Sequence, residues 1–238
     1  MSAALRIYSR EKWGYRAYES NRRKINMYLL IIIYLLILGI AVISYGWSSR
    51  SRNIYIRLMF LYLLLIMVTS LAAIYLVKGN NLFLFHFSIP LEYVILSLIF
   101  HRYLQGRILK RIILVSIPVF LILSAVLSTY VQKLDENNSY AVGVESLAMI
   151  CWSLLALRQL LSDPGIASPW RDHVFWITIA ILYSFTGNMI IEGMLNYTMH
   201  RSMDLAKRLY YVSIIFKYVF LLLLIAGCYC RQLLRTYE

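Results

Sequence analysis

Ionisable side chains lie inside long apolar stretches of this sequence, where a charge is costly and therefore informative. Glu92, Glu145, Glu192 and Lys217 are all placed in this way. A charged side chain at the centre of a bilayer costs on the order of 2.5–3.5 kcal/mol. Such residues usually face the interior of a helix bundle and have a partner there, so these four are the first candidates for chemistry.

Counting along the expected helices places some of these groups at one depth. From the same side, Glu92 lies ten residues into its stretch, Asn188 nine and Lys217 eight, which corresponds to about 12–15 Å. Glu145 and Glu192 lie four and five residues in, nearer the surface. The sequence therefore predicts a funnel of polar groups that opens toward one side of the membrane.

Smaller polar residues add to this predicted site. Ser213 precedes Lys217 by one helical turn, and His86 lies near the mouth of the funnel. Pro90 lacks a backbone donor, which leaves the carbonyl of His86 without its usual helical partner. Along another helix, polar residues recur at every fourth position and form one stripe: Ser184, Asn188, Glu192 and Asn196.

The candidate pocket has two interpretations. In the first, Glu92 and Lys217 form a charge pair that a small molecule, an ion or a proton rearranges on binding. In the second, the same residues only lock helices together. Glu145 is also compatible with a carboxylate at the membrane surface. The full candidate set is Glu92, Lys217, Asn188, Glu192, Ser213, His86 and Glu145.

The elements that must position these residues are seven membrane-spanning helices. Of the 238 residues, 61% are hydrophobic and 15% are charged, which is too apolar for a soluble domain. The apolar stretches are 27–47, 58–77, 82–104, 112–131, 141–161, 174–197 and 209–230. Each is close to the ~20 residues that cross a bilayer as a helix. With such short connections, we expect an all-α, polytopic bundle of seven transmembrane helices that pack mainly against sequence neighbours.

We expect three parts along the chain: a basic, aromatic N-terminal segment (1–26), the transmembrane domain (27–230) and a short C-terminal tail (231–238).

In a membrane protein, the distribution of a net charge of +13 indicates which side of the membrane each loop faces. We expect the lipid bilayer and not nucleic acid as a partner. The loops on the C-terminal side carry eleven basic residues against five on the other side. This favours a cytoplasmic C-terminus in the cell (inner) membrane, although seven basic residues of the N-terminal segment oppose it. A basic loop is expected to face a protein partner: Arg102, Arg107, Lys110 and Arg111.

Motifs of known enzyme chemistry are missing from the sequence. We find no Gly-rich phosphate loop, HExxH helix or GxSxG elbow. The three cysteines do not have the spacing of a metal or redox site. We therefore expect no enzymatic activity and no metal site, and these motifs leave the cofactor unknown.

A lysine in the last of seven helices resembles the arrangement in microbial rhodopsins. That resemblance implies retinal bound to Lys217 as a Schiff base, with Glu92 as its counterion. The chain departs from the family at Ser213, where the rhodopsins have an aspartate four residues before the lysine.

A second resemblance covers more of the chain. The segment from Asn80 to His86 that leads to Pro90 and Tyr93, the segment from Phe175 to Asn188, and the lysine-bearing last helix are similar to small uncharacterised seven-helix bacterial membrane proteins. This resemblance implies one seven-helix unit and names no ligand.

We therefore expect a receptor-like or sensory protein that binds a small molecule or ion in the polar pocket and acts through a partner protein. A transporter or channel component that uses the same Glu and Lys residues is the first alternative, although the sequence has no obvious internal repeat. A structural or assembly subunit of a membrane complex is the second, and a retinal photoreceptor is the third.

Overall fold

The computed structural model describes residues 29–49, 53–76, 82–132, 134, 138–162, 168–199 and 203–235, and at some helix ends only their backbone. The predicted N-terminal segment and the last three residues of the tail lie outside these ranges. Chain contacts divide the protein into two units, residues 1–36 and 37–238. The first unit contributes the helical residues 29–36, and the description below concerns the second.

Within the described ranges, all regular structure is helical, and seven helices are long and apolar enough to cross a membrane. The prediction of an all-α membrane bundle is therefore confirmed. The first helix is Leu29–Ser48. The others are α2 (Ile54–Leu71), α3 (Phe83–Tyr103), α4 (Arg107–Val126), α5 (Ser139–Ser162), α6 (His173–Met199) and α7 (Met203–Arg235).

Several helices extend past the apolar stretches that predicted them. α4 begins at Arg107, five residues before the predicted start at 112. Its first turns carry Arg107, Lys110 and Arg111, whose charges lower the local hydropathy but do not oppose a helix. Hydropathy therefore locates the part of a helix that lipid covers, while the helix itself continues beyond it.

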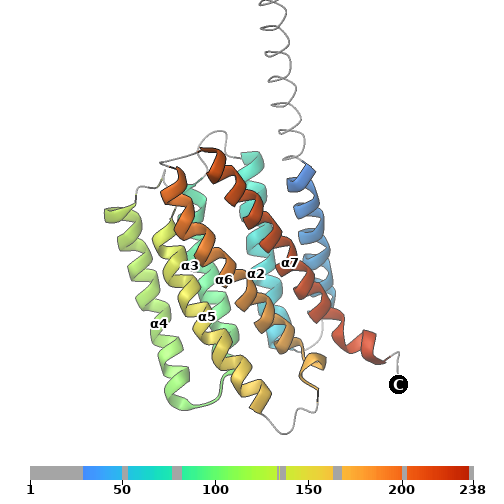
Figure 1. The fold of residues 1–238 in the computed structure, drawn as a ribbon. Coiled ribbons are helices and arrows are strands. Elements are labelled where there is room, and N and C mark those ends of the chain that lie inside the picture. The colour runs from blue at the N-terminus through green and yellow to red at the C-terminus, as the bar shows by residue number, and fades with distance from the viewer. Residues whose placement is uncertain are drawn as a thin grey trace, which may run out of the picture. The chain divides into compact units, whose positions relative to one another are not determined.

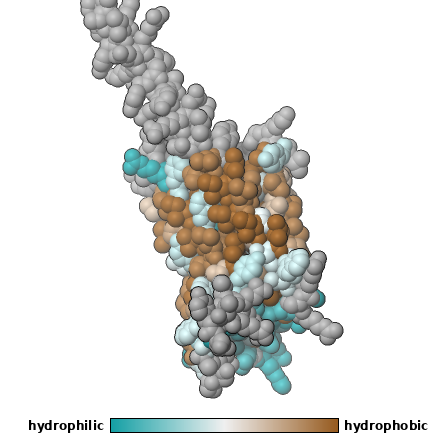
Figure 2. Space-filling view, turned by 90° about the vertical axis from the view of Figure 1, so that its right-hand side faces the viewer, coloured by the Kyte–Doolittle hydropathy of each residue, from teal (hydrophilic) through white to brown (hydrophobic). Residues whose placement is uncertain are grey.

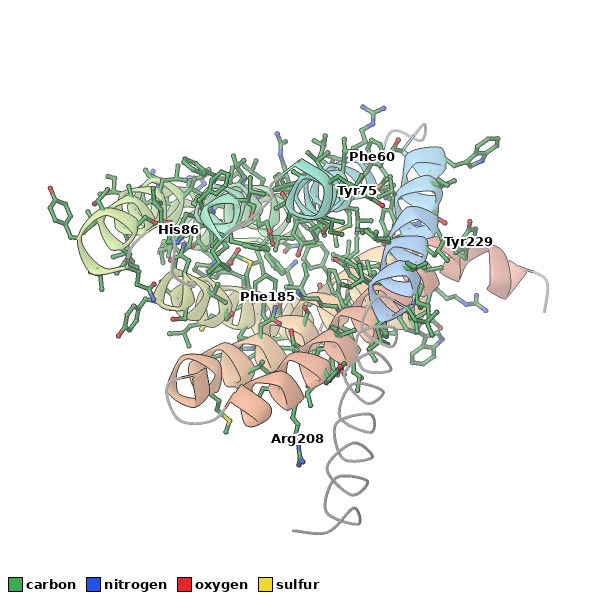
Figure 3. The ribbon with its side chains drawn as sticks, turned by 90° about the horizontal axis from the view of Figure 1, so that it is seen from above. Phe60, Tyr75, His86, Phe185, Arg208 and Tyr229 are labelled. Atoms are coloured by element: carbon green, nitrogen blue, oxygen red, sulfur yellow. The ribbon has the colours of Figure 1, made fainter. Side chains whose placement is uncertain are left out.

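Residues 37–238 are arranged in two layers of helices. α4, α3 and α2 lie side by side in one layer, and α5, α6 and α7 form the other (Figures 1 and 3). Between the layers, α3 packs on α5. Tyr62 of α2 meets Phe220 of α7 edge to face, with ring centroids 6.1 Å apart. The Tyr45 hydroxyl donates to the Leu224 carbonyl at 3.0 Å and joins the first helix to α7.

One pair of sequence neighbours departs from the predicted packing. α4 and α5 hardly touch, because α5 packs on α3 and α6 instead. α4 therefore lies at the edge of its layer and leaves an apolar face uncovered, where Val115, Val119 and Ile122 are exposed.

α6 and α7 run antiparallel and are joined by two close approaches at glycines. A Cβ atom on Gly187 of α6 would overlap the ring of Phe216, and one on Gly227 of α7 would lie 2.5 Å from Cβ of Trp176. Phe216 also stacks on Tyr183, with ring centroids 4.9 Å apart. Small residues permit such close helix packing in membranes, so these contacts fix the register of α6 against α7.

α3 and α5 run in the same direction (Figure 1) and are fastened together at one end. Gln159 of α5 accepts a hydrogen bond from the backbone N–H of Gln105 at 2.8 Å and donates to the Tyr103 carbonyl at 3.3 Å. These bonds hold the three-residue turn between α3 and α4, in which Gly106 has a φ of 97°. A positive φ is readily adopted only by glycine.

The other end of the bundle contains two π-helical turns that sequence reasoning missed. They follow α2 and α4 and cover Ala72–Leu76 and Leu127–Val131. His86 of α3 lies beside the second, with its Nδ1 atom 2.8 Å from Oγ of Ser128. Such turns often occur at functional sites.

Apolar side chains form a broad band on the face drawn in Figure 2, with hydrophilic ones gathered below it. Exposed aromatic residues lie near the helix ends on both sides of the bundle. Tyr75 and Tyr130 lie at the end with the π-helical turns, and Trp47 and Trp170 lie at the opposite end. Tyrosine and tryptophan favour the two membrane surfaces, so these residues mark where the lipid core ends.

Candidate functional site

Three ionisable side chains from three helices come together between the two layers. Glu92 of α3 lies within electrostatic range of both Lys217 of α7 and Glu145 of α5. Gly187 of α6 lies against Phe216 of α7. Asn188 and Lys217 are the next residues on these two helices, so they lie at about the same level. We call Glu92, Glu145 and Lys217, together with the neutral Asn188, the charged cluster.

Lys217 is exposed although it lies on the buried face of its helix. Ser213, one turn before it, is 6% exposed, and Leu221, one turn after it, is 1% exposed. The lipid-facing side of α7 is marked by Ile215 and Leu222, which are 56% and 54% exposed. Residues four apart on a helix lie on one face, so Lys217 does not belong to that lipid-facing side.

Glu92 shows a milder form of the same pattern, because it is half-buried. The residues one turn before and one turn after it, Ser88 and Leu96, are both buried.

Asn188 is also half-buried, while Ser184 before it and Ile191 after it on the same face are buried. Glu92, Asn188 and Lys217 thus each keep accessible surface on a helix face that is otherwise buried.

Glu145 is the most deeply placed member of the cluster. Its side chain is 3% exposed, and its Oε1 atom has no hydrogen-bond partner. Glu145 is therefore buried among the helices, and the alternative of a carboxylate at the membrane surface stays a prediction. α5 begins at Ser139, which puts Glu145 deeper in its helix than the apolar stretch had indicated. A buried polar atom without a partner is uncommon in folded proteins and calls for a physical explanation.

The described part of the chain forms no direct ion pair between Glu92 and Lys217, so their charges interact across a gap. A charge pair inside a low-dielectric region is strongly stabilising only when its members touch and their remaining polar atoms are satisfied. The charged cluster meets neither condition. Its geometry is that of an electrostatically coupled but incompletely paired site.

The other predicted pocket residues do not all join the cluster. Ser213 is buried one turn from Lys217. His86 is buried as well, and its ring binds Ser128. The side chain of Glu192 lies outside the described part of the structure. Figure 3 shows Phe185 of α6 pointing into the middle of the bundle, whereas Arg208 of α7 points away from it.

The predicted basic loop lies at the opposite end of α3 from His86. Arg102, Arg107 and Arg111 are exposed, and Lys110 is half-buried. His101 lies within electrostatic range of Arg102 and Lys110. We call the residues from Arg102 to Arg111 the basic turn.

Several buried polar groups were missed by reasoning from the sequence. The hydroxyls of Ser88 and Ser97 on α3 and of Ser146 and Ser153 on α5 have no hydrogen-bond partner. Ser88 precedes Glu92 by one turn, and Ser146 is next to Glu145. The closeness of Ser88 and Ser146 to the two carboxylates was visible in the sequence. Among the described residues, no group of three or more His, Cys, Asp or Glu side chains is arranged to hold a metal ion.

The fold and the cluster define an all-helical, multi-pass membrane protein with ionisable groups between its helices. No family model, curated protein or solved structure matches the chain. The resemblances to microbial rhodopsins and to the seven-helix bacterial proteins therefore receive no support from these comparisons.

Proposed function

We propose that this chain is a receptor-like membrane protein that binds a small molecule or ion at the charged cluster and acts through a partner protein. The observation that carries the proposal is Lys217, an exposed cation on a buried helix face between Ser213 and Leu221. A flexible, strongly hydrated ammonium group in this place supports an opening that water and a ligand reach from one side of the membrane.

The partial exposure of Glu92 and Asn188 supports the same opening. Both belong to otherwise buried faces of helices other than that of Lys217. Ligand pockets are mostly apolar cavities with a few convergent polar groups. The cluster offers such groups, with Phe185 as an apolar neighbour one turn from Asn188.

The connection of the cluster to the basic turn favours signalling over passive binding. α3 carries Glu92 and leads into the basic turn. α5 carries Glu145, and its Gln159 forms hydrogen bonds to the backbone of this turn and of the end of α3. A ligand that changes the repulsion between Glu92 and Glu145 acts on both of the helices that hold the basic turn. Energetic coupling between distant sites is carried by such packed, rigid elements.

The basic turn is the surface that we propose for a partner, on the cytoplasmic side of the inner membrane. Three of its cations are exposed, and cytoplasmic loops carry the excess of Lys and Arg in membrane proteins. An acidic surface on a partner protein complements these charges and steers its approach.

Hydrogen exchange tests the receptor function on the purified protein. We expect Lys217→Met to change amide exchange rates at residues 104–111 by about fivefold or more, because allosteric coupling energies of 1–3 kcal/mol correspond to factors of this size. Mass spectrometry of exchanged peptides measures the effect. Arg208→Met is the matched control, since it removes an exposed cation of the same helix that points away from the bundle. Equal exchange at 104–111 in wild type and both variants contradicts the receptor function.

A transporter or channel component is the main alternative and uses the same residues. A cation flux into proteoliposomes that is present in the wild type and absent in Lys217→Met would show a transporter and not a receptor. An assembly subunit is the second alternative, and it requires that the chain unfold when it is purified without other subunits. Retinal bound to Lys217 stays a prediction from the sequence.

A further inference from the structure

The charges of the cluster do not balance. When both carboxyl groups are ionised, Glu92 and Glu145 contribute two negative charges and Lys217 contributes one positive charge, so the cluster then has a net charge of −1. Residual charge in a low-dielectric region is costly unless a counter-charge is close. A single additional positive charge at the carboxylates balances the cluster.

Buried oxygen atoms without hydrogen-bond partners occur on both of the helices that carry the carboxylates. Oε1 of Glu145 is one, and its side chain is 97% buried by accessible area, given an exposure of 3%. The buried hydroxyls of Ser146 and Ser88 are two more, and they are neighbours of Glu145 and Glu92 along their helices. Carboxylate and other hard oxygen ligands suit hard cations such as those of the alkali metals.

Lys217 is positioned to compete with such a cation. Its ammonium group interacts with Glu92 without an ion pair, and its side chain is exposed. The long lysine side chain changes rotamer at little cost. When a cation occupies the carboxylates, the attraction that holds the ammonium group toward Glu92 is reduced.

We propose that the ligand of the charged cluster is a small monovalent metal cation, held by Glu145 and Glu92, and that Lys217 is its built-in competitor. The inference rests on the proposed function, because it names the ligand class of the same site. The two states of the protein then differ in which positive charge neutralises the carboxylates. Lys217 does so in the absence of the cation, and it is released toward water when the cation binds.

Thermal unfolding of the purified full-length protein in detergent tests this inference. Unfolding is followed by tryptophan fluorescence in NaCl, KCl or LiCl, with choline chloride at equal ionic strength as the reference. We expect at least one of the alkali cations to raise the Tm above its value in choline, because a ligand that binds only the folded state stabilises it. We expect Glu145→Gln, which keeps the shape and removes the charge, to abolish the shift.

Lys217→Met provides the sharper result. Removal of the competing charge is expected to lower the half-saturating cation concentration by about tenfold or more. Tenfold corresponds to about 1.4 kcal/mol, and the repulsion between the ammonium group and a bound cation inside the bundle is expected to exceed this value. Arg208→Met, which removes an exposed cation of the same helix that points away from the bundle, is expected to leave it unchanged. If Glu145→Gln does not fold, Glu92→Gln serves in its place.

Two outcomes contradict the proposal that the ligand is a metal cation. One is equal Tm values in all four salts for both wild type and Lys217→Met. The other is a Tm that follows pH but no alkali cation at any pH, which identifies a proton as the ligand. Neither outcome affects the hydrogen-exchange experiment on the basic turn. The proposal of a cation can therefore be contradicted while the receptor function is not.

Discussion

Replacement of Gly187 by alanine will lower the free energy of unfolding by about 1–3 kcal/mol, the usual cost of an overpacked site. The added Cβ atom overlaps the ring of Phe216 at three of its carbons. Phe216 cannot withdraw freely, because its ring also stacks on the ring of Tyr183. We expect α6 and α7 to separate locally. Unfolding in a denaturing detergent, followed by tryptophan fluorescence, measures the change.

Gly143→Ala is the matched control for this prediction. Gly143 also lies within a helix, but a Cβ atom there meets nothing within 4 Å. Alanine at this position is expected to leave stability unchanged or to raise it by up to about 1 kcal/mol through its better helix propensity. Equal effects of the two substitutions would contradict the close approach of α6 and α7.

The second large effect concerns the interaction between Glu92 and Lys217. In a double-mutant cycle with Glu92→Gln and Lys217→Met, we expect a coupling energy of about 1–2 kcal/mol. This lies above the ~0.2–1 kcal/mol of exposed pairs and below the ~3–5 kcal/mol lost when a fully buried pair is broken. The intermediate value follows from a half-buried carboxylate, an exposed lysine and the lack of a direct ion pair.

Each variant of the cycle is unfolded under the same conditions, and the coupling energy is the deviation from additivity. Arg208→Met with Glu92→Gln is the control pair. Arg208 points away from the bundle, so its cycle is expected to be additive within about 0.5 kcal/mol. Additivity in both cycles would mean that Glu92 and Lys217 do not interact across the bundle.

The helices of this protein follow from its hydropathy, and the layers do not. Each apolar stretch became a helix that crosses the bundle, because backbone groups in lipid must bond within their own segment. The separation of α4 from α5 was not predictable, since hydropathy says which residues face lipid but not which helices touch. The π-helical turns, such as Leu127–Val131, also leave no mark in hydropathy.

The candidate site was partly visible in the sequence for a similar reason. Charge inside an apolar stretch singled out Glu92, Glu145 and Lys217, and counting along the helices placed Glu92 beside Lys217. The helix of Glu145 begins before the apolar residues do, so its place along the helix differs from the one counted in the sequence. The roles of Ser88 and Ser146 depend on which groups lack partners, and only three-dimensional packing determines that.

The central claim is that Lys217 faces water inside the bundle and not lipid. Thiol labelling tests this claim in a variant that lacks the native Cys151, Cys228 and Cys230. Lys217→Cys is compared with two controls on the same helix. Ile215→Cys replaces an exposed apolar residue of the lipid-facing side, and Leu221→Cys replaces a buried residue one turn away. A membrane-impermeant, positively charged methanethiosulfonate reagent is applied to proteoliposomes.

We predict that Lys217→Cys reacts at least about tenfold faster than both controls, because the reactive thiolate forms only where water reaches it. A slow reaction at all three positions, equal within error, would contradict a water-accessible charged site and with it the proposed ligand-binding function.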